Sequence, residues 1–224
     1  MRHFHYPNRS AAVAGEAMAA TSHPLATLTA IEILKSGGNA VDAAIAAAAV
    51  LCVAEPAMTG IGGDCFALYA PKAGLPVAYN GSGRTPKAAE FAWYRDRKYT
   101  EIPIESPHSV TVPGAIDAWF RLLRDHGTKE MAALLQPAIR AAEEGVRVTP
   151  RVAFDWAIAE PKLKRDPATR AIFLPSDKPP TVGPTKSKRS HNRSGPTIPN
   201  GPRQLRTTKP RNRQHHAKSA TQIS

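Results

Sequence analysis

"TGIGGDCFALYA", residues 59–70, joins a glycine-rich loop to a short apolar run. A P-loop requires GxxxxGK[ST], and no Lys-Ser or Lys-Thr pair follows these glycines. A dinucleotide-binding loop requires GxGxxG before a helix, whereas Cys65 stands where the third glycine belongs and strand-forming residues follow it. The loop is therefore not a phosphate cradle. Two interpretations remain: a tight turn with glycines at positive φ, or a close approach of its backbone to a ligand or a second chain segment.

Two helices are predicted before this loop. The first begins at Pro24, which suits the first helical position, and ends at the Gly37-Gly38 pair, which suits a left-handed C-terminal cap. The second is capped by Asn39, carries Asp42 in its positively polarised first turn, and ends before Pro56. Its run of alanines is small enough for close packing, so we expect this helix to be buried.

After the loop the pattern changes to short strands and then back to helices. The strands and helices are predicted at residues 65–70, 75–80 and 108–114, and at residues 115–127, 129–145 and 149–160, respectively. The first two strands form a hairpin across "PKAG", residues 71–74. This order of helices, a few strands and helices again predicts an α+β fold.

In the first helix after the strands, an apolar stripe recurs at helical spacing. Such a stripe is typical of a core face rather than of a cofactor site, and its members are Ile116, Trp119, Phe120 and Leu123. Three predicted strands are few for a sheet that must cover this many helices.

The net charge of +12 is concentrated at one end of the chain. Residues 1–175 contain 19 basic and 17 acidic side chains, whereas residues 176–224 contain 11 basic side chains and one acid, Asp177. The second segment has seven prolines, no aromatic residue and no hydrophobic period. It cannot bury enough apolar surface to offset its chain entropy, so we predict a disordered basic tail.

The remaining bulk features predict a cytoplasmic protein that does not enter a membrane. The first ten residues contain no apolar signal-peptide core. The apolar run Ala43–Ala54 is about half the length that spans a bilayer. Cys52 and Cys65 form neither a CxxC motif nor a metal-ligand cluster, so free thiols in a reducing compartment are expected.

Arg84 is the candidate binding residue. It lies in "YNGSGRTPKAAE", a glycine-bearing turn directly after a predicted strand. A guanidinium fork in such a turn suits bidentate capture of a carboxylate, and the alternative is an exposed loop arginine without a ligand. His108 and His126 are interpreted as surface or capping residues. No catalytic triad and no metal-ligand cluster is predicted.

Taken together, these segments resemble the gamma-glutamyltransferase (gamma-glutamyltranspeptidase) family over roughly residues 11–183. The similarity lies in the N-terminal, large-subunit part of such enzymes. The matching segments, in order, are "AMAATSHPLATLTAIEILKSGGNAVDAAIAAAAVLCVAEPAMTGIGGDCFALYA", "NGSGRTP", "SVTVPGAIDAWFRLLRDHGT", "LLQPAIRAAEEG" and "IFLPSDKPPTVG".

The resemblance implies a four-layer αββα N-terminal-nucleophile hydrolase fold, of which residues 1–175 would form a large-subunit portion. It implies autocatalytic cleavage of a precursor, after which a new N-terminal threonine attacks an amide carbonyl and its α-amine serves as base. It implies no metal and no organic cofactor. By this resemblance Arg84 matches the arginine that grips the substrate carboxylate, in a gamma-glutamyl compound such as glutathione.

Two departures from the family pattern bear on function. This chain has "SGRTP" where gamma-glutamyltransferases carry an acidic residue after the arginine, and "NGSGR" is more similar to the branch that includes oxamate amidohydrolase and acylase-like members. The family's Thr-Thr-His or Thr-Ser-His nucleophile segment has no counterpart here. "TSH" at residues 21–23 matches an ordinary N-terminal segment, and "TTK" at residues 207–209 lacks the histidine.

We therefore expect a truncated or frame-shifted member of the family that has no catalytic residue in these 224 residues and is inactive alone. A non-enzymatic function, in which the basic tail binds nucleic acid, is the alternative of another class. The tail lacks the aromatic residues on which single-stranded bases stack, so nucleic acid is not the expected partner.

Overall fold

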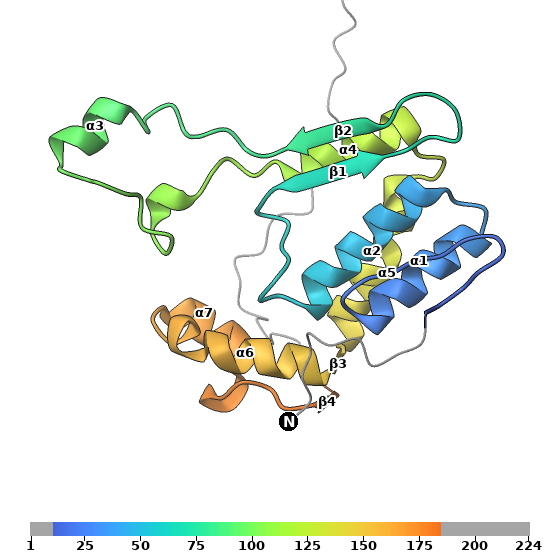
Figure 1. Ribbon diagram of the computed structural model, residues 1–224. Coiled ribbons are helices and arrows are strands. Elements are labelled where there is room, and N and C mark those ends of the chain that lie inside the picture. Colours follow the sequence, from blue (N-terminus) through green and yellow to red (C-terminus); the bar gives the residue numbers. More distant parts are fainter. Residues whose placement is uncertain (1–10, 185–224) are drawn as a thin grey trace, which may run out of the picture. The chain divides into compact units, whose positions relative to one another are not determined.

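The computed structural model describes residues 11–184 (Figure 1). Helices dominate, and the strands form two small antiparallel pairs. The elements in chain order are α1 (Pro24–Lys35), α2 (Ala40–Ala54), β1 (Cys65–Tyr69), β2 (Val77–Gly81), α3 (Phe91–Asp96), the 3-10 turn η1 (Pro107–Ser109), α4 (Ala115–His126), α5 (Met131–Glu144), β3 (Arg147–Val148), α6 (Pro150–Leu163), α7 (Pro167–Phe173), the 3-10 turn η2 (Pro175–Asp177) and β4 (Gly183–Pro184).

The first two helices begin and end as predicted. Helix α1 starts with Pro24 and is followed by Gly37, whose φ of 83° is the left-handed conformation expected after a helix. Helix α2 begins with a capping box. The Asn39 side chain accepts from backbone amides of the first turn, while the Asn39 amide donates to Asp42 at 2.8 Å.

Helix α2 is the centre of the core. Most of its residues are buried, and it contacts α1, α4 and α5. Five of its alanines are almost inaccessible to solvent, so neighbouring helices approach its backbone closely. The prediction of a buried alanine-rich helix is confirmed.

A buried carboxylate ties α2 to the turn between α4 and α5. Asp42 is 0% exposed and accepts hydrogen bonds from both the amide and the hydroxyl of Thr128 and from the amide of Lys129. The Asn39 side-chain amide donates to the His126 carbonyl at 2.6 Å, and Lys129 Nζ donates to the Ser36 carbonyl at 2.9 Å. Five polar contacts therefore fix the ends of three helices against one another.

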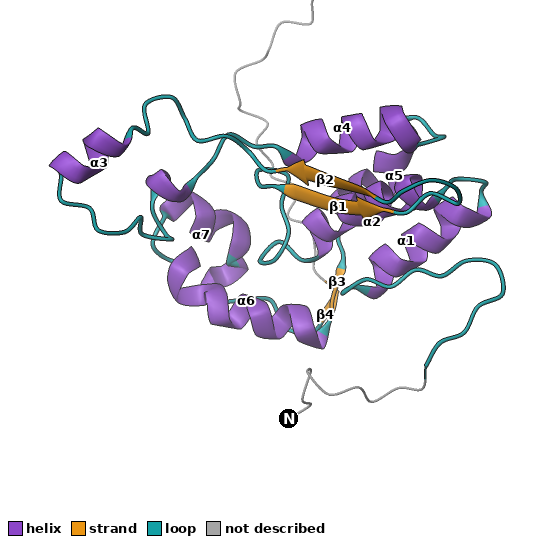
Figure 2. Ribbon diagram, turned by 45° about the horizontal axis from the view of Figure 1, so that its top comes forward, coloured by secondary structure: helices purple, strands orange, loops and turns teal. Residues whose placement is uncertain are grey.

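Strands β1 and β2 form the predicted hairpin, with Cys65 paired to Gly81 and Tyr69 to Val77. Its two faces differ because side chains alternate along a strand. Cys65, Ala67 and Tyr69 pack on the helical core. Phe66 and Leu68 point the other way and are 69% and 78% exposed. The hairpin runs alongside α4, which contacts both of its strands (Figure 2).

Two predictions in this region are wrong. No strand forms at residues 108–114, where the chain instead makes η1 and an irregular stretch. In that stretch the Val112 amide donates to the Arg84 carbonyl at 2.9 Å, but no neighbouring strand completes a ladder. The predicted stripe of α4 is only partly core, because Trp119 is buried whereas Ile116 is 38% and Phe120 is 55% exposed.

The buried face of α4 is rotated from that stripe toward smaller residues. It consists of Ala115, Ala118, Trp119 and Leu122, which pack beneath the hairpin and against α2. Periodicity alone did not reveal this rotation, since alanine is a weak hydrophobic signal but allows the closest packing.

Helices α6 and α7 form a separate pair held by Trp156, whose indole N–H donates to the Phe173 carbonyl at 2.9 Å. Residues 176–184 include η2 and the short strand β4, which pairs with β3. The predicted basic tail covers residues 176–224, and its residues 185–224 lie outside the described part of the chain. The boundary between residues 175 and 176 stays a prediction.

Cys52 and Cys65 are free thiols, and burial raises the pKa of each. Within residues 11–184, none of the helices combines the length and apolar character that a bilayer span requires.

Candidate functional site

The glycine loop and the Arg84 turn meet at one end of the hairpin. Since Cys65 pairs with Gly81, the residues just before β1 and just after β2 are neighbours. A hydrogen bond joins them: the Gly83 amide donates to Asp64 Oδ1 at 2.9 Å. The loop of residues 59–64 and the turn that carries Arg84 therefore form one structural unit.

The start of α4 joins the same unit. The amides of Gly114 and Ala115 both donate to the Gly63 carbonyl, at 3.1 and 3.0 Å. Just before them, Val112 is hydrogen-bonded to the Arg84 carbonyl. Three segments that are distant in sequence are thus joined by backbone hydrogen bonds, and we call this the hairpin-end junction (residues 63–64, 82–84 and 112–115).

The hairpin-end junction is crowded at Gly83 and open at the glycine loop. A Cβ added to Gly83 would lie 1.6 Å from the Val112 carbonyl oxygen, a distance that no side chain tolerates. By contrast, Gly60 and Gly62 have no heavy atom within 4 Å of an added Cβ, and neither has a positive φ. The positive-φ interpretation of this loop is wrong. The second interpretation, close approach to another chain segment, is confirmed at the Gly63 carbonyl.

Arg84 emerges from this junction into solvent. Its backbone is held by Val112, while its side chain is exposed and forms neither a hydrogen bond nor an ion pair with any residue in the range 11–184. The guanidinium keeps its full donor capacity, which is the state required to take an anionic ligand. The positively polarised N-terminus of α4 begins in the same junction and favours negative charge there.

The Thr21-Ser22-His23 segment is part of the fold. Thr21 Oγ1 donates to the His23 carbonyl at 2.8 Å, and Ser22 Oγ donates to Glu55 Oε2 at 2.6 Å. His23 is 3% exposed, and its Nδ1 accepts from the Leu25 amide to cap α1. These side chains hold the start of α1 and join it to the end of α2.

The two isolated histidines have different surroundings. His126 ends α4 and its ring packs on Tyr69 at a centroid distance of 4.7 Å. His108 belongs to an aromatic cluster with Trp93, Tyr94 and Tyr99, which the sequence reasoning missed. The signal was the unusual density of aromatic residues between positions 91 and 99 in a chain that is only 6% aromatic.

Residues 11–184 contain no group of three or more His, Cys, Asp or Glu side chains arranged to hold a metal ion. The hairpin-end junction presents the exposed Arg84 guanidinium, whose backbone carbonyl is held by Val112, and the Asp64 carboxylate, which accepts from the Gly83 amide.

Comparison with known proteins identifies the family. The gamma-glutamyltranspeptidase family model matches residues 26–194, and the chain belongs to this family. It is 36% identical over 175 residues to the acylase ACY 1 proenzyme of Pseudomonas sp. strain SE83, covering 72% of this chain and 31% of the acylase. It is 34% identical over 180 residues to the oxamate amidohydrolase proenzyme of Klebsiella pneumoniae, covering 78% of this chain and 34% of that protein.

Solved structures agree. The gamma-glutamyltranspeptidase of Helicobacter pylori superposes with a TM-score of 0.72 at 29% identity, over 78% of this chain and 51% of the other. Residues 11–184, with their mixed helices and strands, therefore have a fold similar to the matched part of that enzyme. The chain spans about a third of the length of the two curated relatives.

Proposed function

We propose that these residues form the large-subunit part of an amide hydrolase or acyl transferase whose amide substrate bears a carboxylate. The observation that carries this proposal is Arg84, exposed and unpaired among residues 11–184, on a turn that the glycine loop and α4 both anchor. Membership of the gamma-glutamyltranspeptidase family supports the reaction class. Gamma-glutamyl compounds such as glutathione, and oxamate-like amides, each carry both an amide and a carboxylate.

In this scheme Arg84 binds the carboxylate and positions the amide, while an N-terminal threonine of a small subunit attacks the carbonyl carbon. The threonine hydroxyl loses its proton to its own α-amine, the leaving amine takes up that proton, and water or an amino acid then releases the acyl group. The nucleophile lies outside residues 1–224, since Thr21 is used in the fold and no other segment matches the motif. A polypeptide of these residues alone is therefore inactive.

The uncovered face of the hairpin supports the partial-fold proposal. Phe66 and Leu68 are largely exposed on the face opposite the core, and Phe120 is exposed on α4. In a four-layer fold a second sheet packs on such a face. We propose that the C-terminal part of the enzyme supplies that layer.

The Arg84 assignment is tested in an enzyme formed by this chain and a small subunit of the family. Losing a charge-assisted hydrogen bond costs about 1.5–3 kcal/mol, so Arg84→Ala is expected to lower kcat/KM by about 10- to 150-fold. Arg84→Lys should recover only part of this, because an ammonium group lacks the bidentate fork.

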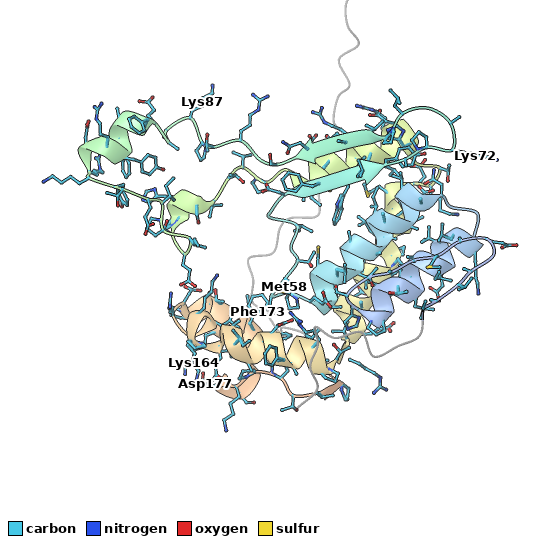
Figure 3. All side chains as sticks on the ribbon, viewed as in Figure 1. Met58, Lys72, Lys87, Lys164, Phe173 and Asp177 are labelled. Carbon is cyan, nitrogen blue, oxygen red and sulfur yellow. The ribbon has the colours of Figure 1, made fainter. Side chains whose placement is uncertain are left out.

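Lys72→Ala is the matched control, since Lys72 is an exposed cation at the opposite end of the same hairpin (Figure 3). Its kcat/KM should stay unchanged. Equal kcat/KM values for Arg84→Ala and the parent enzyme would show that Arg84 does not bind the substrate carboxylate.

We also propose a cytoplasmic location, supported by the free state of Cys52 and Cys65. Recovery of the native protein in the cytosolic fraction, with both thiols alkylated by a membrane-permeant reagent, is the expected result. Recovery outside the cytosol would contradict it.

A further inference from the structure

The connection between β2 and α4 carries an open surface pocket that the family-level function does not use. Figure 1 shows α3 and η1 on this long connection. A cavity of about 250 Å³ lies between them, lined mainly by Pro86, Ala88, Trp93, Tyr94, Pro107 and His108. Apolar cavities of about 150 Å³ already admit benzene, so this space accepts an aromatic ring with a short linker.

The aromatic side of the pocket is held in place by its own contacts. The ring centroid of Trp93 lies 5.0 Å from Tyr94 and 5.2 Å from His108, and Tyr94 lies 5.5 Å from His108 in an edge-to-face arrangement. Tyr99 contacts all three rings. A cluster that only stapled the connection would fill its own space, whereas here proline and alanine on the facing wall leave room for another ring.

The positive charge of Arg97, beside the pocket, favours a ligand with a neutral aromatic ring over a cationic ligand. The guanidinium of Arg97 lies 4.0 Å from the centroid of Trp93, where it takes up the electron-rich face that would otherwise attract an ammonium group. The walls contain no carboxylate. Aromatic ligands gain from edge-to-face contacts with such walls without needing a counter-charge.

The pocket is tied to Arg84 at both of its ends. Pro86 lies two residues after Arg84, and the lining residue Val110 lies two residues before Val112, whose amide donates to the Arg84 carbonyl. Two residues span at most about 7 Å of extended chain. A ligand with a ring in the pocket therefore has its carboxylate within reach of Arg84 when a few methylenes separate the two groups.

We propose that this pocket binds the aromatic side chain of a substrate whose carboxylate is held by Arg84. Binding of the carboxylate by Arg84 rests on the function proposed above. Binding of the aromatic ring is argued from the pocket alone. Substrates with an aromatic acyl or amine part are then preferred over oxamate-sized ones.

The test uses the 224-residue chain and two probes observed by fluorine NMR, 4-(4-fluorophenyl)butyrate and the matched alcohol 4-(4-fluorophenyl)butanol. Both probes should bind, and contacts between the probe ring and the Trp93 ring should appear in nuclear Overhauser spectra. Ala88→Phe fills the pocket and should weaken binding of both by about tenfold or more. Ala92→Phe places the same side chain on an exposed position of α3 outside the lining and should change binding by less than about twofold.

Arg84→Ala separates the two halves of the proposal. It should weaken binding of the acid to the level of the alcohol and leave the alcohol unchanged. Suppose that Ala88→Phe weakens binding of the alcohol, while Arg84→Ala leaves binding of the acid unchanged. The pocket is then supported, and Arg84 does not bind the carboxylate. If neither probe contacts Trp93, or if Ala88→Phe changes nothing, the pocket proposal is overturned.

Discussion

The buried carboxylate of Asp42 is expected to contribute strongly to the stability of the fold. Burial raises the pKa of its carboxyl, but hydrogen bonds from the Thr128 side chain and from the amides of Asn39, Thr128 and Lys129 outweigh it, and the pKa is lowered overall. The charged form therefore contributes to stability. Its donors come from the start of α2 and from the turn after α4, so losing the carboxylate releases both.

Asp42→Ala is expected to lower the free energy of unfolding by about 3 kcal/mol or more, because it leaves several buried donors unpaired. Asp117→Ala is the matched control: Asp117 is 65% exposed and pairs with Arg121 at 2.9 Å, so the cost should stay below about 1 kcal/mol. Urea unfolding followed by circular dichroism measures both. Similar midpoints for the two variants would show that the buried hydrogen bonds contribute little.

The same carboxylate predicts sensitivity to acid. Since its pKa is lower in the folded state, its contribution is complete above the unfolded pKa of about 4 and is lost as the pH falls through the folded value. Asp42→Asn should therefore flatten the fall in stability below about pH 4. An unaltered pH profile in the variant would assign the acid sensitivity to other groups.

At the scale of elements, the hairpin-end junction depends on close backbone approach. Gly83→Ala must move the irregular segment around Val112, since its Cβ would meet the Val112 carbonyl oxygen at 1.6 Å. We expect a loss of about 2 kcal/mol or more in the free energy of unfolding, the range of other steric insertions into packed regions. Gly62→Ala meets no atom within 4 Å and should cost less than about 1 kcal/mol. Equal losses in the free energy of unfolding for Gly83→Ala and Gly62→Ala would mean that the hairpin-end junction accommodates the added methyl group without strain.

The elements also show what the sequence can and cannot reveal. Local signals located α1, α2 and the hairpin correctly: Pro24 at a helix start, the Asn39 cap, and two short strand-forming runs joined by residues 71–74. Helix α3 was not predicted, because its six residues are too few for a helical period to show. The contact between Gly63 and α4 was equally hidden, since it joins segments about fifty residues apart through backbone atoms alone. The assignment of Arg84 to anion binding stays a prediction, made because an arginine in a glycine-bearing turn suits a carboxylate.

At the scale of the molecule, apolar surface remains uncovered on the hairpin. Phe66 and Leu68 are side by side on the open face, a pattern typical of an interface. Phe66→Thr combined with Leu68→Thr should reduce dye binding and self-association of the isolated chain, since threonine keeps strand propensity. The same change should impair assembly with a small subunit. Improved solubility with undiminished assembly would show that the proposed second layer does not pack there.

We have proposed that these residues supply the carboxylate-binding part of a gamma-glutamyltranspeptidase-type enzyme and lack its nucleophile. The most direct measurement is turnover of gamma-glutamyl-p-nitroanilide and of oxamate by the pure 224-residue chain. The account predicts a rate equal to that of buffer for both substrates. A rate that rises in proportion to the chain's concentration and stays constant through further purification would contradict it.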